Sequence, residues 1–145
     1  MFDNGGPILE PNTINNLWPT ISPLLDRLVD EKVSMDDIYD LIMNRRWLLW
    51  VNTDLSTVIV TEFIYYPQVT NLRIVLLAGD DVDWAEGIHV FEGFARINGC
   101  HSVEILGRKG WQRVLKDQNY RLSHITLSKP VHIKLNWGRF RITRN

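Results

Sequence analysis

Cysteine is nearly absent from this chain of 145 residues, which contains only Cys100. A single cysteine excludes a disulfide within the chain and a zinc site built from several thiolates. The four histidines do not show the close spacing of metal ligands, so we expect no metal site. A chain without disulfides is typical of a reducing, cytosolic environment.

Long apolar runs and a strong net charge are absent as well. The longest apolar stretches fall far short of the roughly 20 residues that a membrane-spanning helix needs. The first residues contain no basic segment followed by an apolar one, so we expect no export signal and no membrane partner. Sixteen basic and 17 acidic residues give a net charge of -1. This charge provides no general attraction to nucleic acid, which is therefore not an expected partner.

What the sequence does contain is a clear change of hydrophobic period along the chain. Residues 1–12 are rich in Gly, Pro and Asn and are expected to form an irregular arm. Helical spacing follows Ser22-Pro23, which resemble an N-cap and a first helical residue. A second stretch of helical spacing follows Ser34. Ser34 and Asp37 together resemble a capping box. Two helices are therefore predicted before any strand.

The rest of the chain alternates between strand-like and helix-like segments. Strands are predicted at 47–51, 57–66, 72–78, 103–106, 121–127 and 131–142, and helices at 84–98 and 111–116. The 72–78 strand, the helix after it and the 103–106 strand form a βαβ unit, whose two strands should be parallel. The predicted fold class is α/β (or α+β), a single domain whose mixed, twisted sheet has helices on both faces.

This order of elements resembles the GNAT family of N-acetyltransferases over residues 13–131. Two segments, FEGFARINGCHSVEILGRKGWQRVL at 91–115 and YRLSHITLSK at 120–129, more narrowly resemble small proteins of tailed bacteriophages and prophages with this fold. That phage family has no settled activity, and some relatives, such as a minor internal virion protein, belong to the phage particle. The resemblance implies an acyl-CoA N-acyltransferase (GNAT)-like domain at 13–131, followed by a C-terminal strand, hairpin or interface extension at 132–145.

The loop at 79–87 corresponds to the place where active GNAT members bind the coenzyme A pyrophosphate, through an Arg/Gln-x-x-Gly-x-Gly/Ala motif. Here the loop has Gly79 and Gly87, but no basic residue and not that spacing. Four acids stand in it instead: Asp80, Asp81, Asp83 and Glu86. Acids stabilise a helix N-terminus, and Asp83 with Glu86 suits an N-cap and its partner. We therefore expect a capped helix start without an anion site, and no cofactor.

A second position of the family pattern also differs. Many active members have a tyrosine in the helix after the fifth strand, and it protonates the leaving thiolate. Alignment on Asn119-Tyr120 puts Leu115 at that position, and a leucine cannot donate a proton. Tyr120 is expected to pack at the start of the next strand.

Glu62 is a weak candidate for a catalytic residue. It lies in a predicted strand between Val60 and Ile64, and burial of that face would make it a candidate general base. The alternative is a carboxylate that is partly solvated or paired with an arginine across the sheet. Glu104 is expected to face solvent or to be paired, and Cys100 to be buried for structural reasons.

The basic residues allow two interpretations. One group suits either a phosphate contact or a solvated face: Arg108, Lys109, Arg113, Lys116 and Arg121. The C-terminal stretch contains interface candidates, because Trp and Arg are enriched at binding hot spots. These candidates are Lys134, Trp137, Arg139, Phe140 and Arg141. The alternative for this stretch is a final hairpin that completes the sheet.

Taken with the resemblance, these features favour a non-catalytic GNAT-fold protein of a tailed phage, a virion-associated structural or assembly component. Its expected partners are other phage structural proteins or further copies of itself. The expected location is the host cytoplasm during expression, and then the virion. One alternative is a divergent N-acetyltransferase that uses acetyl-CoA, and another is a small host-directed binding protein.

Overall fold

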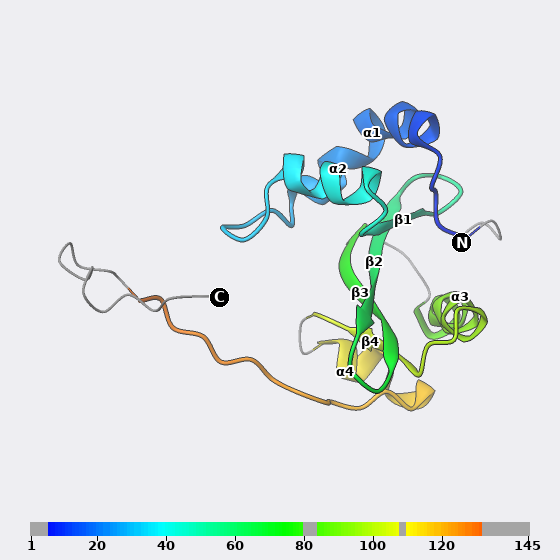
Figure 1. The fold of residues 1–145 in the computed structure, drawn as a ribbon, viewed down its shortest axis with the longest axis vertical. Helices are drawn as coiled ribbons and strands as arrows, with labels where there is room; N and C mark the ends of the chain where they lie inside the picture. The colour runs from blue at the N-terminus through cyan, green and yellow to red at the C-terminus, as the bar shows by residue number, and fades with distance from the viewer. Residues whose placement is uncertain (1–5, 80–83, 108–109, 132–145) are drawn as a thin grey trace.

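A computed structural model describes residues 6–79, 84–107 and 110–131 of the chain. Four strands form one sheet: β1 (Leu48–Val51), β2 (Thr57–Tyr65), β3 (Thr70–Gly79) and β4 (Ser102–Ile105). The helices are α1 (Pro11–Asp26), α2 (Met35–Met43), α3 (Trp84–Ile97) and α4 (Gly110–Val114), with a short 3-10 helix, η1 (Lys116–Gln118). Figure 1 shows their arrangement.

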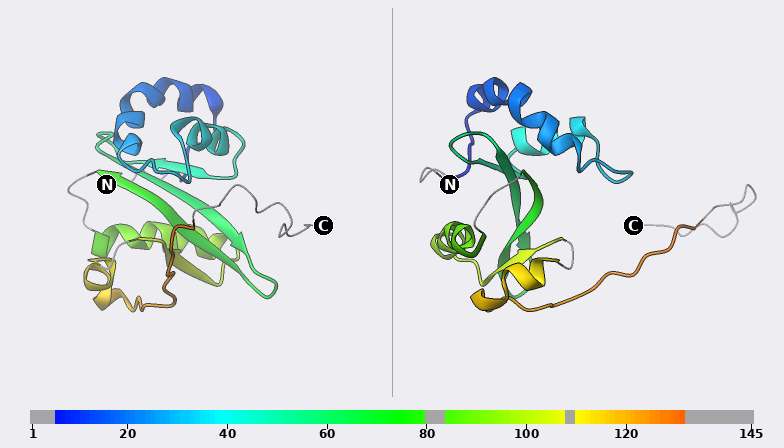
Figure 2. Two further views of the ribbon diagram at one scale, coloured as in Figure 1. Left: turned by 90° about the vertical axis from the view of Figure 1, so that its left-hand side faces the viewer. Right: turned by 180° about the vertical axis from the view of Figure 1, so that it is seen from behind.

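The sheet is mixed, with the strand order β1-β2-β3-β4. The first three strands are antiparallel neighbours, whereas β3 and β4 run parallel. The helices α1 and α2 lie on one side of this sheet, and α3 lies on the other (Figure 2). The predicted fold class and the predicted βαβ unit, β3-α3-β4, are therefore confirmed.

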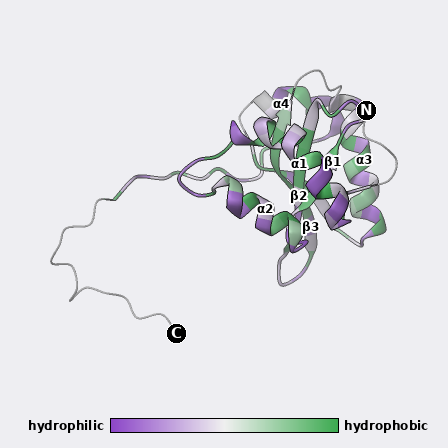
Figure 3. Cartoon of the chain, turned by 90° about the horizontal axis from the view of Figure 1, so that it is seen from above, coloured by the Kyte–Doolittle hydropathy of each residue, from purple (hydrophilic) through white to green (hydrophobic). Residues whose placement is uncertain are grey.

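Each face of the sheet has its own hydrophobic core. The side chains of α1 and α2 pack on one face against Leu49, Val58 and Val60. On the other face, α3 and Leu115 pack against the strands. Apolar residues are accordingly concentrated in the strands between the helices (Figure 3). The sheet is thus the central layer of a three-layer domain.

The first helix begins earlier than the sequence suggested. Its N-cap is Glu10, whose carboxylate accepts hydrogen bonds from the backbone N–H groups of Asn12 and Thr13. The predicted start at Ser22-Pro23 is wrong, because these residues lie inside α1. The buried side chains are Ile14, Ile21 and Leu25. This apolar spacing continues through both internal prolines, which lie on the exposed side, where water can hydrate the carbonyls that they leave unpaired.

The second helix begins as predicted. Ser34 is its N-cap and forms a reciprocal capping box with Asp37. The Ser34 backbone N–H donates to the Asp37 carboxylate, and the Ser34 hydroxyl oxygen accepts from the Asp37 backbone N–H. The backbone bond, with the nearby Ser34 side chain, lowers the pKa of Asp37. Two orphan backbone donors are satisfied in this way, which fixes the start of α2.

The strand predicted at 121–127 is wrong. Residues 121–131 have no helix or strand, and each of them is exposed. They leave the domain as an extended segment (Figure 1). The period-2 pattern that predicted a strand needs a neighbouring strand to pair with, and this segment has none within the described chain. Apart from Val131, the predicted strand at 131–142 lies outside the described residues. Among the described helices, none is both long enough and apolar enough to cross a membrane.

Candidate functional site

The strands β3 and β4 separate part-way along the sheet. They pair only from Asn71 to Ile74 on β3, and the last bond joins the Leu106 N–H to the Ile74 carbonyl at 3.1 Å. A bulge at this point sets Ile74 and Leu76 opposite consecutive residues of β2, so that Val75 is the extra residue. Beyond it, β3 continues to Gly79 without β4. Ligands of parallel sheets bind where neighbouring strands diverge at their carboxyl ends, which makes this opening the candidate site.

Gly79 closes β3 for a reason that lies in the sheet. Its φ is +125°, and an added Cβ would lie 2.2 Å from the Ser56 carbonyl oxygen and 2.7 Å from the Thr57 Cα. Only glycine fits this close contact between the ends of β2 and β3. The glycine that resembled part of a phosphate loop therefore has a structural role.

The helix after this loop begins at Trp84, as predicted. Glu86 lies in its first turn, and Gly87 is buried. The predicted cap Asp83, together with Asp80 and Asp81, lies outside the described residues. A carboxylate in the first turn stabilises the helix dipole, and it also repels an anion that approaches the same turn.

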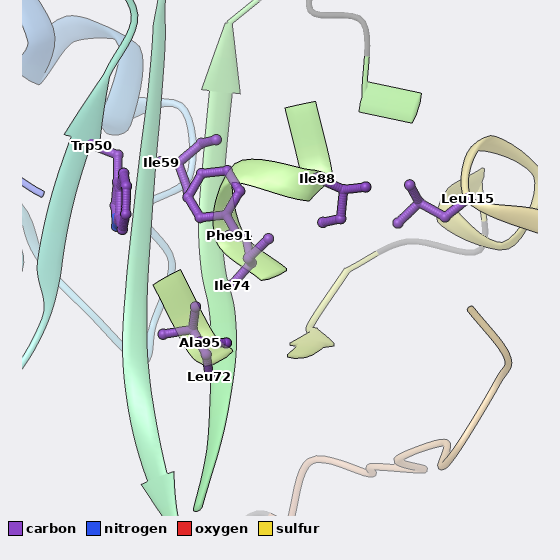
Figure 4. Packing of buried hydrophobic residues seen from close by; sticks show 8 residues of the cluster. All are labelled: Trp50, Ile59, Leu72, Ile74, Ile88, Phe91, Ala95 and Leu115. Carbon is purple, nitrogen blue, oxygen red and sulfur yellow. The ribbon is translucent and has the colours of Figure 1, made fainter. Parts of the chain in front are cut away.

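Leu115, the position that the family resemblance aligns with the general acid, is part of the core. Leu115 is 1% exposed, and its side chain points toward Ile88 of α3 (Figure 4). Its backbone N–H bonds to the Trp111 carbonyl at 3.0 Å. The Trp111 ring in turn meets the Trp84 ring edge to face, with the two centroids 5.3 Å apart. The turn after α4 thus inserts an apolar side chain against α3.

Tyr120 has the structural role that the sequence suggested, although no strand follows it. Its hydroxyl donates to a carboxylate oxygen of Glu92 on α3 at 2.7 Å. Burial, together with this hydrogen bond to an anion, raises the pKa of Tyr120 far above its ordinary value. The hydroxyl therefore stays protonated, and it holds the chain after η1 against α3.

The expectation that Glu104 faces solvent or is paired is confirmed in its second form, because Glu104 belongs to a polar cluster across β3 and β4. The sequence did not reveal the other members of this cluster. The carboxylate of Glu104 accepts hydrogen bonds from Tyr66 at 2.6 Å, Asn71 at 2.6 Å and Arg73 at 2.9 Å. Partial burial opposes ionisation, but these three bonds outweigh it and lower the pKa of Glu104. Arg73 lies opposite Glu104 because the parallel register puts it there. Register is set by tertiary packing, so no local pattern could have indicated this cluster.

Glu62 lies on the neighbouring strand, directly opposite Arg73. It is half-buried, and one of its carboxylate oxygens accepts a hydrogen bond from the Trp47 indole at 3.1 Å. The arginine that could have paired with it bonds to Glu104 instead. The general-base role of Glu62 stays a prediction.

The remaining candidates that the structure describes do not form one cluster. Cys100 is half-buried, and burial raises the pKa of its thiol. Within the described residues, no group of His, Cys, Asp and Glu could hold a metal ion. Arg113, Lys116 and Arg121 are exposed. Several candidates lie outside the described residues: Arg108, Lys109, Lys134, Trp137, Arg139, Phe140 and Arg141.

Comparison with solved structures identifies the architecture. A probable acetyltransferase superposes with a TM-score of 0.60 at 8% identity, over 85% of this chain and 95% of that one. An aminoglycoside acetyltransferase from an uncultured soil metagenomic sample, in complex with sisomicin, gives 0.56 at 14% identity, over 87% and 93%. This chain has a GNAT-like fold. A transcriptional regulator from Bacillus halodurans also matches, with a TM-score of 0.56 at 14% identity, over 81% and 94%.

Neither a protein-family model nor a curated protein matches this sequence. At identities this low, the similarity shows the GNAT-like fold alone, because one fold supports several functions. Function must therefore be argued from the residues at the opening between β3 and β4.

Proposed function

We propose that this chain is a GNAT-fold protein without acetyltransferase activity, which acts through protein–protein contacts. The observation that carries the proposal is Leu115. The side chain at the general-acid position is 1% exposed and belongs to the core beside α3. It can neither donate a proton nor reach a thiolate in the opening. A tyrosine there would have to replace a packed leucine, which cores tolerate poorly.

The loop after β3 supports the same proposal. Its sequence contains Asp80, Asp81, Asp83 and Glu86 and no basic residue. A pyrophosphate would meet several negative charges close to the helix terminus that should attract it. Like charges at such short range disfavour binding, so acetyl-CoA is not a ligand under this proposal.

We further propose that the contacts belong to the assembly or structure of a tailed-phage particle. The support for this part is the resemblance of segments 91–115 and 120–129 to small phage and prophage proteins. Mass spectrometry of purified particles would test it. The chain should be present in reproducible amounts after stringent washing, and its absence from washed particles would contradict a virion role.

A thermal-shift titration with acetyl-CoA tests the loss of coenzyme binding. A ligand at 100 times its dissociation constant stabilises a protein by about 2.7 kcal/mol, which raises the midpoint of a domain of this size by several degrees. We expect no saturable shift with micromolar acetyl-CoA. A saturable shift that desulfo-coenzyme A reproduces and adenosine does not would contradict the proposal.

A divergent N-acetyltransferase is the second candidate, and one observation favours it. The strands β3 and β4 diverge after Ile74, which leaves the edge of β3 from Val75 to Gly79 without a strand beside it among the described residues. Such an edge offers backbone groups to an extended ligand. Release of free coenzyme A from acetyl-CoA, measured with a thiol reagent and a panel of amines, would distinguish this candidate from the first.

A further inference from the structure

In the described part of the chain, β4 forms one outer edge of the sheet. β4 is the last strand in the order β1-β2-β3-β4, and no strand lies on its outer side within the described residues. An exposed edge presents unpaired N–H and C=O groups, and it is a template for another extended segment. Nothing in this strand blocks such pairing, since Ser102, Val103, Glu104 and Ile105 include no proline or lysine.

A groove runs along the start of this edge. It has a volume of about 620 Å³ and is lined by α3, by residues 100–103 and by residues 118–123. Its lining includes Cys100, two residues before β4, and Tyr120, which follows η1. The groove therefore joins the free edge to the point where the extended segment leaves the domain.

The extended segment, residues 121–131, has apolar side chains of the kind that a strand normally buries. Four of its apolar side chains are mostly exposed: Leu122 at 61%, Ile125 at 70%, Leu127 at 88% and Val131 at 76%. A soluble domain rarely exposes several large apolar side chains on one short segment unless that segment binds something. The segment contains no helix or strand of its own.

We propose that residues 121–131 of one copy pair with the β4 edge of a second copy, and that the exchange is reciprocal. Each copy would then donate its own residues 121–131 and receive the same residues of the other copy at its β4 edge. The contact is self-complementary and closes as a two-fold dimer. Backbone pairing supplies affinity, and the groove receives the apolar side chains, as in other cases of strand addition.

The path of the chain favours exchange over closure within one copy. Tyr120 is held to Glu92 on α3, and the residue before it, Asn119, is left-handed, with a φ of 66°. From this anchored point the segment continues without a turn and leads away from the domain (Figure 2). Within the described residues, 121–131 form no strand pairing with β4 of the same copy. This inference does not depend on the loss of coenzyme binding, since an active or an inactive protein could dimerise in this way.

Sedimentation velocity of the full chain, combined with hydrogen–deuterium exchange, tests the proposal. The wild type should be a dimer in which residues 121–131 and β4 are protected. Ile125→Asp with Leu127→Asp should raise the dimer dissociation constant about tenfold or more and remove that protection. The matched control is Ile97→Asp, because Ile97 is 87% exposed at the end of α3 and outside the segment, and this variant should stay dimeric.

A mixed cross-linking experiment separates exchange from closure within one copy. One chain keeps Cys100, and the other carries Cys100→Ser with Ser128→Cys, so that each has one thiol. After the two are mixed and refolded, a short bis-maleimide should join them into a covalent heterodimer. The background is measured with a mixture in which both chains carry Cys100→Ser, so that neither has the thiol at position 100.

Three results would overturn the proposal. The first is a monomer, whether or not residues 121–131 are protected, because protection in a monomer means closure onto the chain's own β4. The second is a dimer that the double aspartate variant leaves intact. The third is a mixture that forms no cross-link between the two chains above background. The cross-link does not require the aspartate variant to fold, so the proposal stays testable if that variant does not.

Discussion

The hydroxyl of Tyr120 donates a 2.7 Å hydrogen bond to the Glu92 carboxylate, and this bond joins the chain after η1 to the middle of α3. The same carboxylate accepts a contact from His89 Nδ1 at 2.8 Å, one turn away on α3. Tyr120 is thus held as a protonated donor to a structural anion. It fixes one side of the groove beside the start of β4.

Replacement of this tyrosine should lower stability in a pH-dependent way. Tyr120→Phe removes one hydrogen bond to a charged group, which lowers the free energy of unfolding by about 1.5 kcal/mol near pH 7. Because the pKa of Tyr120 is raised in the folded state, the contribution is complete below the unfolded pKa of about 10 and falls as the pH rises above it. Urea unfolding between pH 7 and 11 should show the two proteins converging. A constant difference across that range would contradict the account.

The cluster around Glu104 predicts the opposite pH dependence. The folded-state pKa of Glu104 is lowered, so its contribution is present above the unfolded pKa of about 4.3 and is lost as the pH falls through the folded pKa. Glu104→Gln should destabilise the protein by about 1 kcal/mol at pH 7 and make the acid limb of the stability curve shallower. The control is Glu31→Gln on an exposed turn, which should follow the wild type in the same titration.

The end of β3 can be tested with two glycines in different environments. Gly79→Ala forces a Cβ to within 2.2 Å of the Ser56 carbonyl at a φ of +125°, and should cost about 2 kcal/mol or more. Gly93 lies inside α3 with no heavy atom within 4 Å of the added Cβ. Gly93→Ala should therefore stabilise the protein by about 0.5–1 kcal/mol. Thermal unfolding of both variants tests this difference. Similar shifts of the two unfolding midpoints, with the same sign, would mean that the contact at Gly79 is misplaced.

The sequence predicted those parts of the fold that depend on local signals. Ser34 and Asp37 marked the start of α2, and the change of period at Trp84 marked the start of α3, because capping and hydrophobic spacing act over a few residues. The start of α1 was missed because Pro23 was interpreted as a first-turn residue. An exposed proline can lie inside a helix, and burial decides between these two cases only after folding.

The candidate site was predictable only in part. The inward packing of Leu115 is confirmed by its burial, whereas its alignment with a proton donor rests on the family resemblance and stays a prediction. The cluster of Tyr66, Asn71, Arg73 and Glu104 could not be predicted, because it depends on the register of a parallel strand pair separated by a whole helix. The predicted strand at 121–127 failed for a related reason. Its apolar residues indicate that it needs a partner, but a sequence pattern does not say which chain provides that partner.

Hydrogen–deuterium exchange with and without acetyl-CoA tests the central claim most directly, because it locates any binding on the chain. A coenzyme in the opening would cover the free edge of β3 beyond Ile74 and the first turn of α3, and would slow amide exchange in both. We predict that millimolar acetyl-CoA leaves exchange at Val75–Gly79 and Trp84–Ile88 unchanged. Selective protection of these two segments, absent with adenosine alone, would contradict the claim that this GNAT-like fold has lost its coenzyme site.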